Sequence, residues 1–386
     1  MNERATDHHL VTHRAGLDAM VGAVANAGRC AIDTESASFH RYADRLYLAQ
    51  VATEDRVWVI DPLAVTDLEP LGRLLADRNI EIILHDADFD LRTLNRDYGF
   101  IAANVFDTRV AAELAGEPSV GLAALLERHF GVRLDKRFQR ADWSMRPLSK
   151  EMLAYAADDT RYLVKLRDLL ARRLVELDRL AWAEEDFQRI ESVRWERPDE
   201  AQAYLRLKGA KTLSPRQRAA LRELYAWRDD IACRLDRSPF RVAANDALVA
   251  TARALPTSPR ALRAIPSMSP GLARRHGKAL LAAVRTAVDL GEEKLPELER
   301  RRRAPPDEAS QARFDKLRAL RARRAAHVAL APGLVCPNAA LMALARSVSD
   351  GSPPDFQAAG LKRWQRDLLG EDELIRALEP GADSAG

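Results

Sequence analysis

Cysteine is scarce in this sequence: Cys30, Cys233 and Cys336 are the only three among 386 residues, and no two of them form a CxxC pair. This spacing excludes a disulfide framework and argues against structural zinc, so we expect three buried small hydrophobic residues. Long apolar runs are missing too, since no stretch approaches the roughly 18 residues of a membrane span and the N-terminus lacks the apolar core of a signal peptide. We therefore expect a cytoplasmic protein without membrane contact.

The composition has no extreme, but the charge is unevenly distributed. With 47% hydrophobic and 30% charged residues, the chain is too apolar for a disordered or fibrous protein, and its length predicts two or three domains. Residues 1–200 hold 36 acidic and 27 basic side chains, whereas residues 201–386 hold 21 acidic and 33 basic ones. This asymmetry predicts a polyanion-binding part joined to a part that gathers carboxylates.

Patterns typical of strands occur only in the first part of the chain. Helices are expected over 65–76 and 86–97, and after Asp107 the pattern is helical almost to the end, with one long helix over 150–174 capped by Ser149. This order predicts a mixed sheet flanked by helices, followed by all-α segments. The strand-like segments are RCAIDTES from Arg29, RLYLAQVAT from Arg45, RVWVIDP from Arg56, EIILH from Glu81 and NVFDT from Asn104.

One internal repeat lies in the basic half. The segment VAANDAL, which begins at Val242, returns as VCPNAAL from Val335, an offset of 93 residues. The shared spacing predicts two copies of one helical module, at 213–288 and 311–380. The charged, proline-containing segment around 300–306 predicts a linker between them.

Two acidic residues stand close together on the first predicted strand. Asp33 and Glu35 are at positions i and i+2, so both carboxylates leave the same face of the sheet. A strand end near solvent would explain the pair. A bound divalent metal also would, because hard oxygen ligands turn the mutual repulsion of two carboxylates into coordination.

Other acids begin or line two of the predicted helices. Asp86, Asp88 and Asp90 follow the EIILH strand, where acids favour the positive end of a helix; this explains Asp90 least, because it is already in the second turn. Tyr155 and Asp159 are at i and i+4 of the long helix and so share one face. Each of these groups alone is also consistent with an ordinary surface or a hydrogen-bonded pair.

Taken together, the acids stand in an order that resembles the DEDD exonuclease superfamily, in its tyrosine-containing branch. The segments DWSMRPLSKEMLAYAADDTRYL and LHDADFDL are similar to ribonuclease D. The resemblance implies an α/β RNase H-like exonuclease domain at 1–197, a helicase-and-RNase-D C-terminal (HRDC) domain at 207–290, a linker at 291–310, and a second, diverged HRDC-like domain at 311–380.

The resemblance also implies the site and its chemistry. Asp33, Glu35, Asp90 and Asp159 would bind two divalent metal ions, Mg²⁺ or Mn²⁺, and the Tyr155 hydroxyl would position the attacking water. Asp86, Asp88 and Asp158 would be neighbours of the ligands, and Asp107 would be structural or lie behind them. The implied reaction removes nucleotides from the 3′ end of RNA, in tRNA precursors above all, by a monomeric enzyme.

Contacts to RNA are expected from cations that precede the tyrosine helix and from the basic modules. The candidates are Arg146 first, then Lys136, Arg137 and Arg140; Trp143 is interpreted as packing. The sequence departs from the family at Ser36, where ribonuclease D chains often carry an aromatic residue, and its next aromatic residue is Phe39. How the terminal base is held is therefore open.

Two other functions remain possible at this point. The same fold serves DNA 3′–5′ exonucleases, although the helical modules and the absence of a polymerase-sized region favour RNA. A non-catalytic RNA-binding scaffold would have a decayed site, whereas all four acids and the tyrosine are present here.

Overall fold

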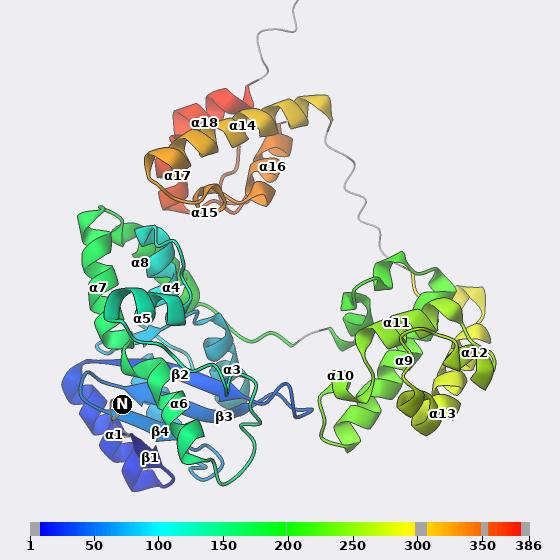
Figure 1. Ribbon diagram of the computed structural model, residues 1–386. Coiled ribbons are helices and arrows are strands. Elements are labelled where there is room, and N and C mark those ends of the chain that lie inside the picture. Colours follow the sequence, from blue (N-terminus) through cyan, green and yellow to red (C-terminus); the bar gives the residue numbers. More distant parts are fainter. Residues whose placement is uncertain (1–7, 198, 298–306, 349–353, 380–386) are drawn as a thin grey trace, which may run out of the picture.

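A mixed six-stranded sheet forms the centre of the N-terminal domain in the computed structural model, which describes residues 8–197, 199–297, 307–348 and 354–379 (Figure 1). The strand order is β1-β4-β3-β2-β5-β6. Strands β2, β3 and β4 form an antiparallel meander, while β5 and β6 extend it in parallel beside β2. The strands are β1 His9–Val11, β2 Arg29–Ser36, β3 Leu46–Ala52, β4 Val57–Ile60, β5 Glu81–Leu84 and β6 Val105–Asp107.

The predicted mixed sheet is confirmed, together with its five expected strands. Sequence reasoning missed β1, which has only three residues and pairs in parallel with the edge of the meander at β4. A segment this short shows no alternation to recognise. The helix that follows it, α1 (Arg14–Ala27), was missed as well.

Alternating side chains of β2 divide the core into two layers. Cys30 and Ile32 face one cluster with α1, α2 (Glu69–Ala76) and α3 (Asp88–Tyr98), whereas Ala31 faces the other. The period of two is the pleat of a strand buried on both faces. The second layer consists of α4 Thr108–Ala115, α5 Leu122–Phe130, α6 Lys150–Arg161, α7 Leu163–Glu176 and α8 Leu180–Glu191.

The long helix expected over 150–174 is two helices. Its predicted start is confirmed, because the Ser149 side chain accepts a hydrogen bond from the Met152 amide. It breaks at Tyr162, however, between α6 and α7. The break follows the packing: α6 lies on the strands of the meander, whereas α7 packs mainly against α4 and β5.

Two helical modules follow, and their first three helices match at the offset of 93 residues. Helices α9 (Pro215–Arg234), α10 (Pro239–Val242) and α11 (Asn245–Ala254) correspond to α14 (Glu308–His327), α15 (Pro332–Val335) and α16 (Asn338–Ser347), with both ends of each helix displaced by the same number. The first module continues with α12 (Pro259–Arg263) and α13 (Pro270–Val288). Residues 298–306, which include the whole predicted linker segment at 300–306, lie outside the described residues.

Buried arginines repeat in the same way. Arg228 donates to the Asn245 side chain at 2.6 Å, and Arg321 donates to that of Asn338 at 2.7 Å. The copies differ at Gly370, which has a φ of 82° and separates α17 (Arg363–Leu369) from α18 (Glu371–Leu378). The corresponding part of the first module is the single helix α13.

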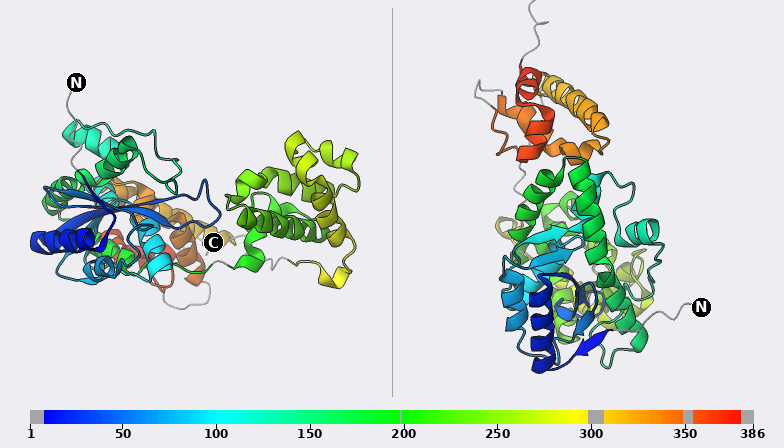
Figure 2. Two further views of the ribbon diagram at one scale, coloured as in Figure 1. Left: turned by 90° about the horizontal axis from the view of Figure 1, so that it is seen from below. Right: turned by 90° about the vertical axis from the view of Figure 1, so that its left-hand side faces the viewer.

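The last module packs on the exonuclease-like layer through α8. The rings of Trp182 and Trp364 stack with their centroids 4.9 Å apart, and Lys362 pairs with Asp186 at 2.6 Å. Buried residues of both parts belong to one hydrophobic cluster, whereas the module at α9–α13 has a core of its own. The right-hand view of Figure 2 shows the last module, in orange and red, directly above the green helices of the N-terminal domain.

The cysteine prediction is correct for two of the three residues. Cys30 and Cys336 are buried, but Cys233 is exposed, because it lies on the outer face near the end of α9. All three are free thiols. No helix in the described ranges is both long enough and apolar enough to span a membrane.

Candidate active site

Strand β2 and helix α6 bring three of the predicted ligands together. Oxygen atoms of Asp33, Glu35 and Asp159 all lie within 4.8 Å of one another. The strand period places the first two on the face that α6 covers, and the helix period places Asp159 on the same side of α6 as Tyr155. These carboxylates converge at the carboxyl-terminal end of β2, in the middle of the sheet.

The fourth predicted ligand, Asp90, lies beside this group but does not belong to it. Its buried carboxylate accepts a hydrogen bond from the Thr34 hydroxyl, which sequence reasoning did not single out. Thr34 lies between the two acids of β2 and so faces the layer of α3, the helix that carries Asp90. Alternation along the strand was the signal that could have identified this contact.

Asp107 holds the turn that begins α3. Its carboxylate accepts hydrogen bonds from the backbone amides of Asp86 and Ala87 at 3.1 and 2.9 Å. It also caps α4 by accepting a hydrogen bond from the backbone amide of Arg109 at 2.8 Å. One of these bonds pairs the backbone amide of Asp86, whose φ of 68° is unusual for a residue other than glycine. The structural role that was expected for Asp107 therefore agrees with its contacts.

Burial and mutual repulsion raise the pKa values of all four acids. Burial, followed by the charge of Asp159, raises the pKa of Asp33 to about 8. Burial and the charge of Asp158 raise the pKa of Asp159 to about 7. The pKa values of Glu35 and Asp90 are also well above the ordinary range, again first through burial and then through the charge of Asp33. The site therefore favours any cation that can replace the protons.

The neighbouring acids differ from these four because each neighbour forms an ion pair. Asp86 pairs with Arg109 at 2.8 Å, Asp88 pairs with Arg92 at 2.7 Å and Asp158 pairs with Arg161 at 3.0 Å. In the part of the chain that the structure describes, no lysine, arginine or histidine pairs with any of the four predicted ligands. A group of oxygen ligands without a protein cation fits a hard divalent metal ion.

The side chain of Tyr155 lies against the acids and is held by aromatic rings. Its ring centroid is 6.0 Å from that of Trp143 and 5.7 Å from that of Phe138. Burial raises the pKa of Tyr155, and the charges of Asp159 and Glu35 raise it further, so the phenol is neutral. Trp143 is itself fully buried, in agreement with a packing role.

Arg146 has a structural role in place of the predicted RNA contact. Its guanidinium donates to both Asp61 oxygens at 2.6 and 2.8 Å and to the carbonyls of Tyr47, Trp143 and Met145. These bonds use all five N–H groups of an arginine, which leaves none for a phosphate. Sequence reasoning could not see this, because Asp61 is 85 residues away in the chain.

The other three predicted cations lie on the loop before α6. Arg137 forms an exposed pair with Asp135 at 2.6 Å, a kind of contact that contributes little and yields readily to a phosphate. Lys136 and Arg140 are exposed and form no ion pair within the described ranges. Arg140 instead lies above the ring of Phe39, at 5.5 Å from its centroid.

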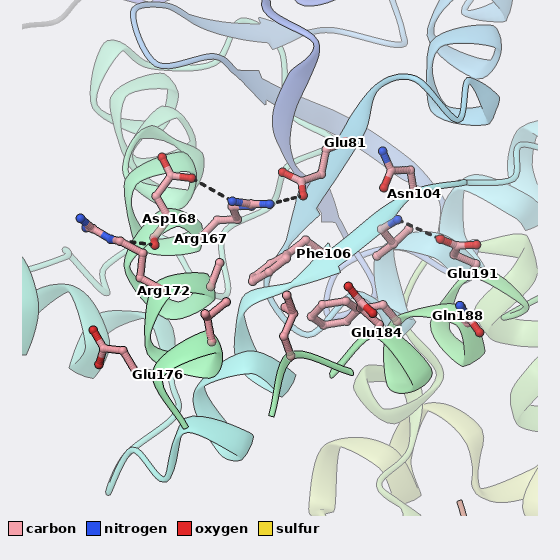
Figure 3. A pocket seen from close by; sticks show the side chains of 15 residues that line it. Glu81, Asn104, Phe106, Arg167, Asp168, Arg172, Glu176, Glu184, Gln188 and Glu191 are labelled. Carbon is pink, nitrogen blue, oxygen red and sulfur yellow. Dashed lines mark hydrogen bonds and ion pairs between the residues drawn. The ribbon is translucent and has the colours of Figure 1, made fainter. Parts of the chain in front are cut away.

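A large cavity among the described residues lies away from these acids. It has a volume of about 1030 Å³ and is lined by α7, α8 and the starts of β5 and β6, where Glu81 and Asn104 lie (Figure 3). Asp33 and Glu35 lie at the opposite end of the parallel strands. Arg167 crosses this cavity to pair with Glu81 and Asp168, and no group of three possible metal ligands occurs there among the described residues.

Comparison with known proteins shows the family of this chain. A family model described as a 3′–5′ exonuclease matches residues 8–175, and the HRDC domain model matches residues 217–284. A ribonuclease D from Pseudomonas paraeruginosa is 33% identical over 353 residues, which cover 90% of this chain and 92% of that protein. The chain belongs to the ribonuclease D family. A ribonuclease D from Gluconacetobacter diazotrophicus is 32% identical and covers 97% of the chain.

The crystal structure of Escherichia coli RNase D, 27% identical, is similar over 98% of this chain and 99% of its own, with a TM-score of 0.73. Membership of the ribonuclease D family establishes the activity. The chain is a 3′–5′ exoribonuclease that binds RNA and divalent metal.

Proposed function

We propose that this ribonuclease D hydrolyses RNA one nucleotide at a time from the 3′ end with two divalent ions, Mg²⁺ or Mn²⁺, and releases nucleoside 5′-monophosphates. The observation that carries the proposal is the cluster of Asp33, Glu35 and Asp159 beside Tyr155, whose acids have raised pKa values and form no ion pair with any described cation. When bound, a pair of divalent ions would neutralise charge on the attacking and leaving oxygens.

Each side chain has a distinct task in this proposal. Asp33, Glu35 and Asp159 would hold the ion on the side of the attacking water, and Asp33 with Asp90 would hold the other. The Tyr155 hydroxyl, a neutral phenol fixed by Phe138 and Trp143, orients the water by hydrogen bonding. It cannot serve as a free base at neutral pH, since its pKa is raised above that of an ordinary tyrosine.

The substrate class follows from the basic modules. Six exposed cations on α12 and α13 of the first HRDC domain have no ion-pair partner among the described residues, which suits electrostatic contact with phosphates and carries no sequence preference. We propose structured RNA with free 3′ ends, tRNA precursors included, in the cytoplasm. The cations are Arg260, Arg263, Arg274, Arg275, Lys278 and Arg285.

We further propose that residues 311–380 form a second, diverged HRDC-like domain and that the enzyme works as a monomer. The common offset of six helices supports the first statement. The single chain already contains the acids, the tyrosine and both modules, which supports the second.

A degradation assay with matched substrates tests the proposal. The substrates are a 3′-extended tRNA and a single-stranded DNA of the same length, each labelled at the 5′ end, with Mg²⁺, with Mn²⁺ or with EDTA. We expect stepwise shortening of the RNA that EDTA and Asp33→Asn abolish, and normal activity in the matched control Asp158→Asn, whose carboxylate pairs with Arg161. Faster shortening of the DNA would contradict the RNA preference, and tight RNA binding without cleavage would indicate a scaffold.

A further inference from the structure

The loop between β2 and β3 of the exonuclease domain contacts the first HRDC domain (Figures 1 and 2). Tyr42 donates its hydroxyl proton to Asp229 at 2.8 Å, and Arg41 pairs with Asp236 at 3.1 Å. The backbone amide of Ser238 donates to the carbonyl of His40 at 3.4 Å. We call these contacts, made by residues 39–42 and by residues 229–240, the junction.

The junction is also tied to the loop that precedes the tyrosine helix. The His40 ring donates to the Arg140 carbonyl at 2.9 Å, and Arg41 donates to the Ser144 hydroxyl at 2.5 Å. Its position is therefore set by both segments that carry the active site, β2 on one side and the approach to α6 on the other. A ligand bound at the junction would be held at a defined distance from the acids.

Two aromatic rings meet at the junction without being buried. Phe39 of the exonuclease domain is 44% exposed and Phe240 of the HRDC domain is 46% exposed, with ring centroids 6.0 Å apart and planes at 75°. The guanidinium of Arg140 lies over the Phe39 ring, and Arg140 and Arg241 form no ion pair among the described residues. A contact that served only to join two domains would exclude water from such rings.

The chain itself limits how far this pair lies from the chemistry. Phe39 follows Glu35 by four residues, which span at most about 14 Å when fully extended. The nucleotides just upstream of the scissile bond are therefore within reach of the rings.

We propose that Phe39 and Phe240 form one platform on which a base of the RNA stacks, a few nucleotides upstream of the scissile phosphate, with Arg140 beside it. Exposed aromatic rings next to unpaired guanidinium groups are the usual means of binding single-stranded RNA without reading its sequence. The platform is composite, since each domain supplies one ring, so it exists only while the junction is formed. It rests on RNA being the substrate and does not depend on the number of metal ions.

An abasic scan tests this platform. A single abasic nucleotide is moved stepwise from the 3′ end of an unstructured RNA, and dissociation constants are measured by fluorescence anisotropy with the inactive Asp33→Asn chain. We expect one upstream position at which loss of the base weakens binding roughly tenfold, the change that corresponds to about 1.4 kcal/mol of stacking. With Phe39→Ala or Phe240→Ala added, binding of intact RNA weakens by a similar factor and the sensitivity of that position disappears.

Further variants separate stacking from a purely structural role. Phe39→Trp retains an aromatic face and should restore the sensitive position, whereas Phe39→Leu retains apolar volume and should not. Ile101→Ala removes an equally exposed side chain of the same domain and should leave the whole scan unchanged. If the scan has the same profile with and without Phe39→Ala, or if Phe39→Leu binds as Phe39 does, the platform is refuted. Failure of the exoribonuclease assignment would be seen separately, as an active-site-intact chain that shortens no RNA.

Discussion

The raised pKa values of the acidic cluster predict that divalent metal and pH control the stability of the exonuclease domain. In the absence of metal, Asp33 keeps its proton up to about pH 8 in the folded protein, whereas in the unfolded chain it loses the proton near its ordinary pKa of about 3.9. The folded state therefore binds more protons in this window. Its free energy of unfolding is highest below about pH 4 and falls as the pH rises towards 8.

The size of this effect follows from linkage. Each acid that is protonated only in the folded state lowers the free energy of unfolding by about 1.4 kcal/mol per pH unit. Because the Asp33 side chain is partly exposed, solvent reduces this value, and we expect Asp33 alone to account for a loss of about 1–2 kcal/mol between pH 5.5 and 7.5. For a domain of this size the loss corresponds to a fall in Tm of roughly 2–8 °C.

Added Mg²⁺ should reverse the loss, because the ion replaces the protons. At a free concentration of about 100 times Kd it stabilises the folded state by about 2.7 kcal/mol, and the gain should be larger at pH 8 than at pH 6, where protons compete. Thermal unfolding followed by circular dichroism, with EDTA or Mg²⁺ at each pH, measures both effects. Asp33→Asn should flatten both, while Asp88→Asn, which loses only its pair with Arg92, should behave as the wild type. An equal Mg²⁺ shift at both pH values would refute the reasoning.

Three further predictions concern other parts of the molecule. Tyr155→Phe should lower kcat for RNA by about 10²-fold or more without changing the RNA dissociation constant or Tm, because only the water-orienting hydroxyl is lost; an unchanged kcat would remove Tyr155 from the mechanism. Arg146→Ala should destabilise the fold by about 3 kcal/mol, because it leaves Asp61 and three backbone carbonyls without their hydrogen-bond donor. Chemical denaturation should show this loss. A variant that keeps its stability but loses RNA affinity would mean that Arg146 contacts RNA after all. Trp364→Ala should expose the α8 face and increase hydrogen exchange there by removing the stack on Trp182; unchanged exchange would mean that this stack does not hold the module.

Much of the fold could be predicted from local pattern. Short apolar runs predicted the strands of the meander. The sequence repeat predicted the two helical modules, and the helix ends of the modules are displaced by the same offset as the repeat. The elements that were missed or altered depend on partners distant in sequence. Strand β1 forms because the edge of β4 is free to pair with it. The helix breaks at Tyr162 because α6 and α7 pack on different partners.

The site divides in the same way. Spacing predicted that Asp33 and Glu35 share one face of a strand and that Tyr155 and Asp159 share one face of a helix, because side chains repeat with periods of 2 and 3.6 residues. The resemblance to the exonuclease family was needed to combine the two pairs into one site. Helix spacing is consistent with the pairs of Asp88 with Arg92 and of Asp158 with Arg161, which are four and three residues apart. Only the folded chain brings Arg109 to Asp86 and leaves the four predicted ligands without an ion pair among the described residues.

By itself, then, the sequence determined the order of the acids and the basic modules, since these depend on residue type and local periodicity, and the resemblance of that order to a known family indicated the class of chemistry. Tertiary structure alone decided the use of individual cations and aromatic rings, since a side chain's partners are set by contacts between distant segments. Arg146 forms hydrogen bonds to Asp61, whereas the guanidinium of Arg140 lies over the exposed ring of Phe39. Phe39 gains a second ring only because the first HRDC domain places Phe240 beside it.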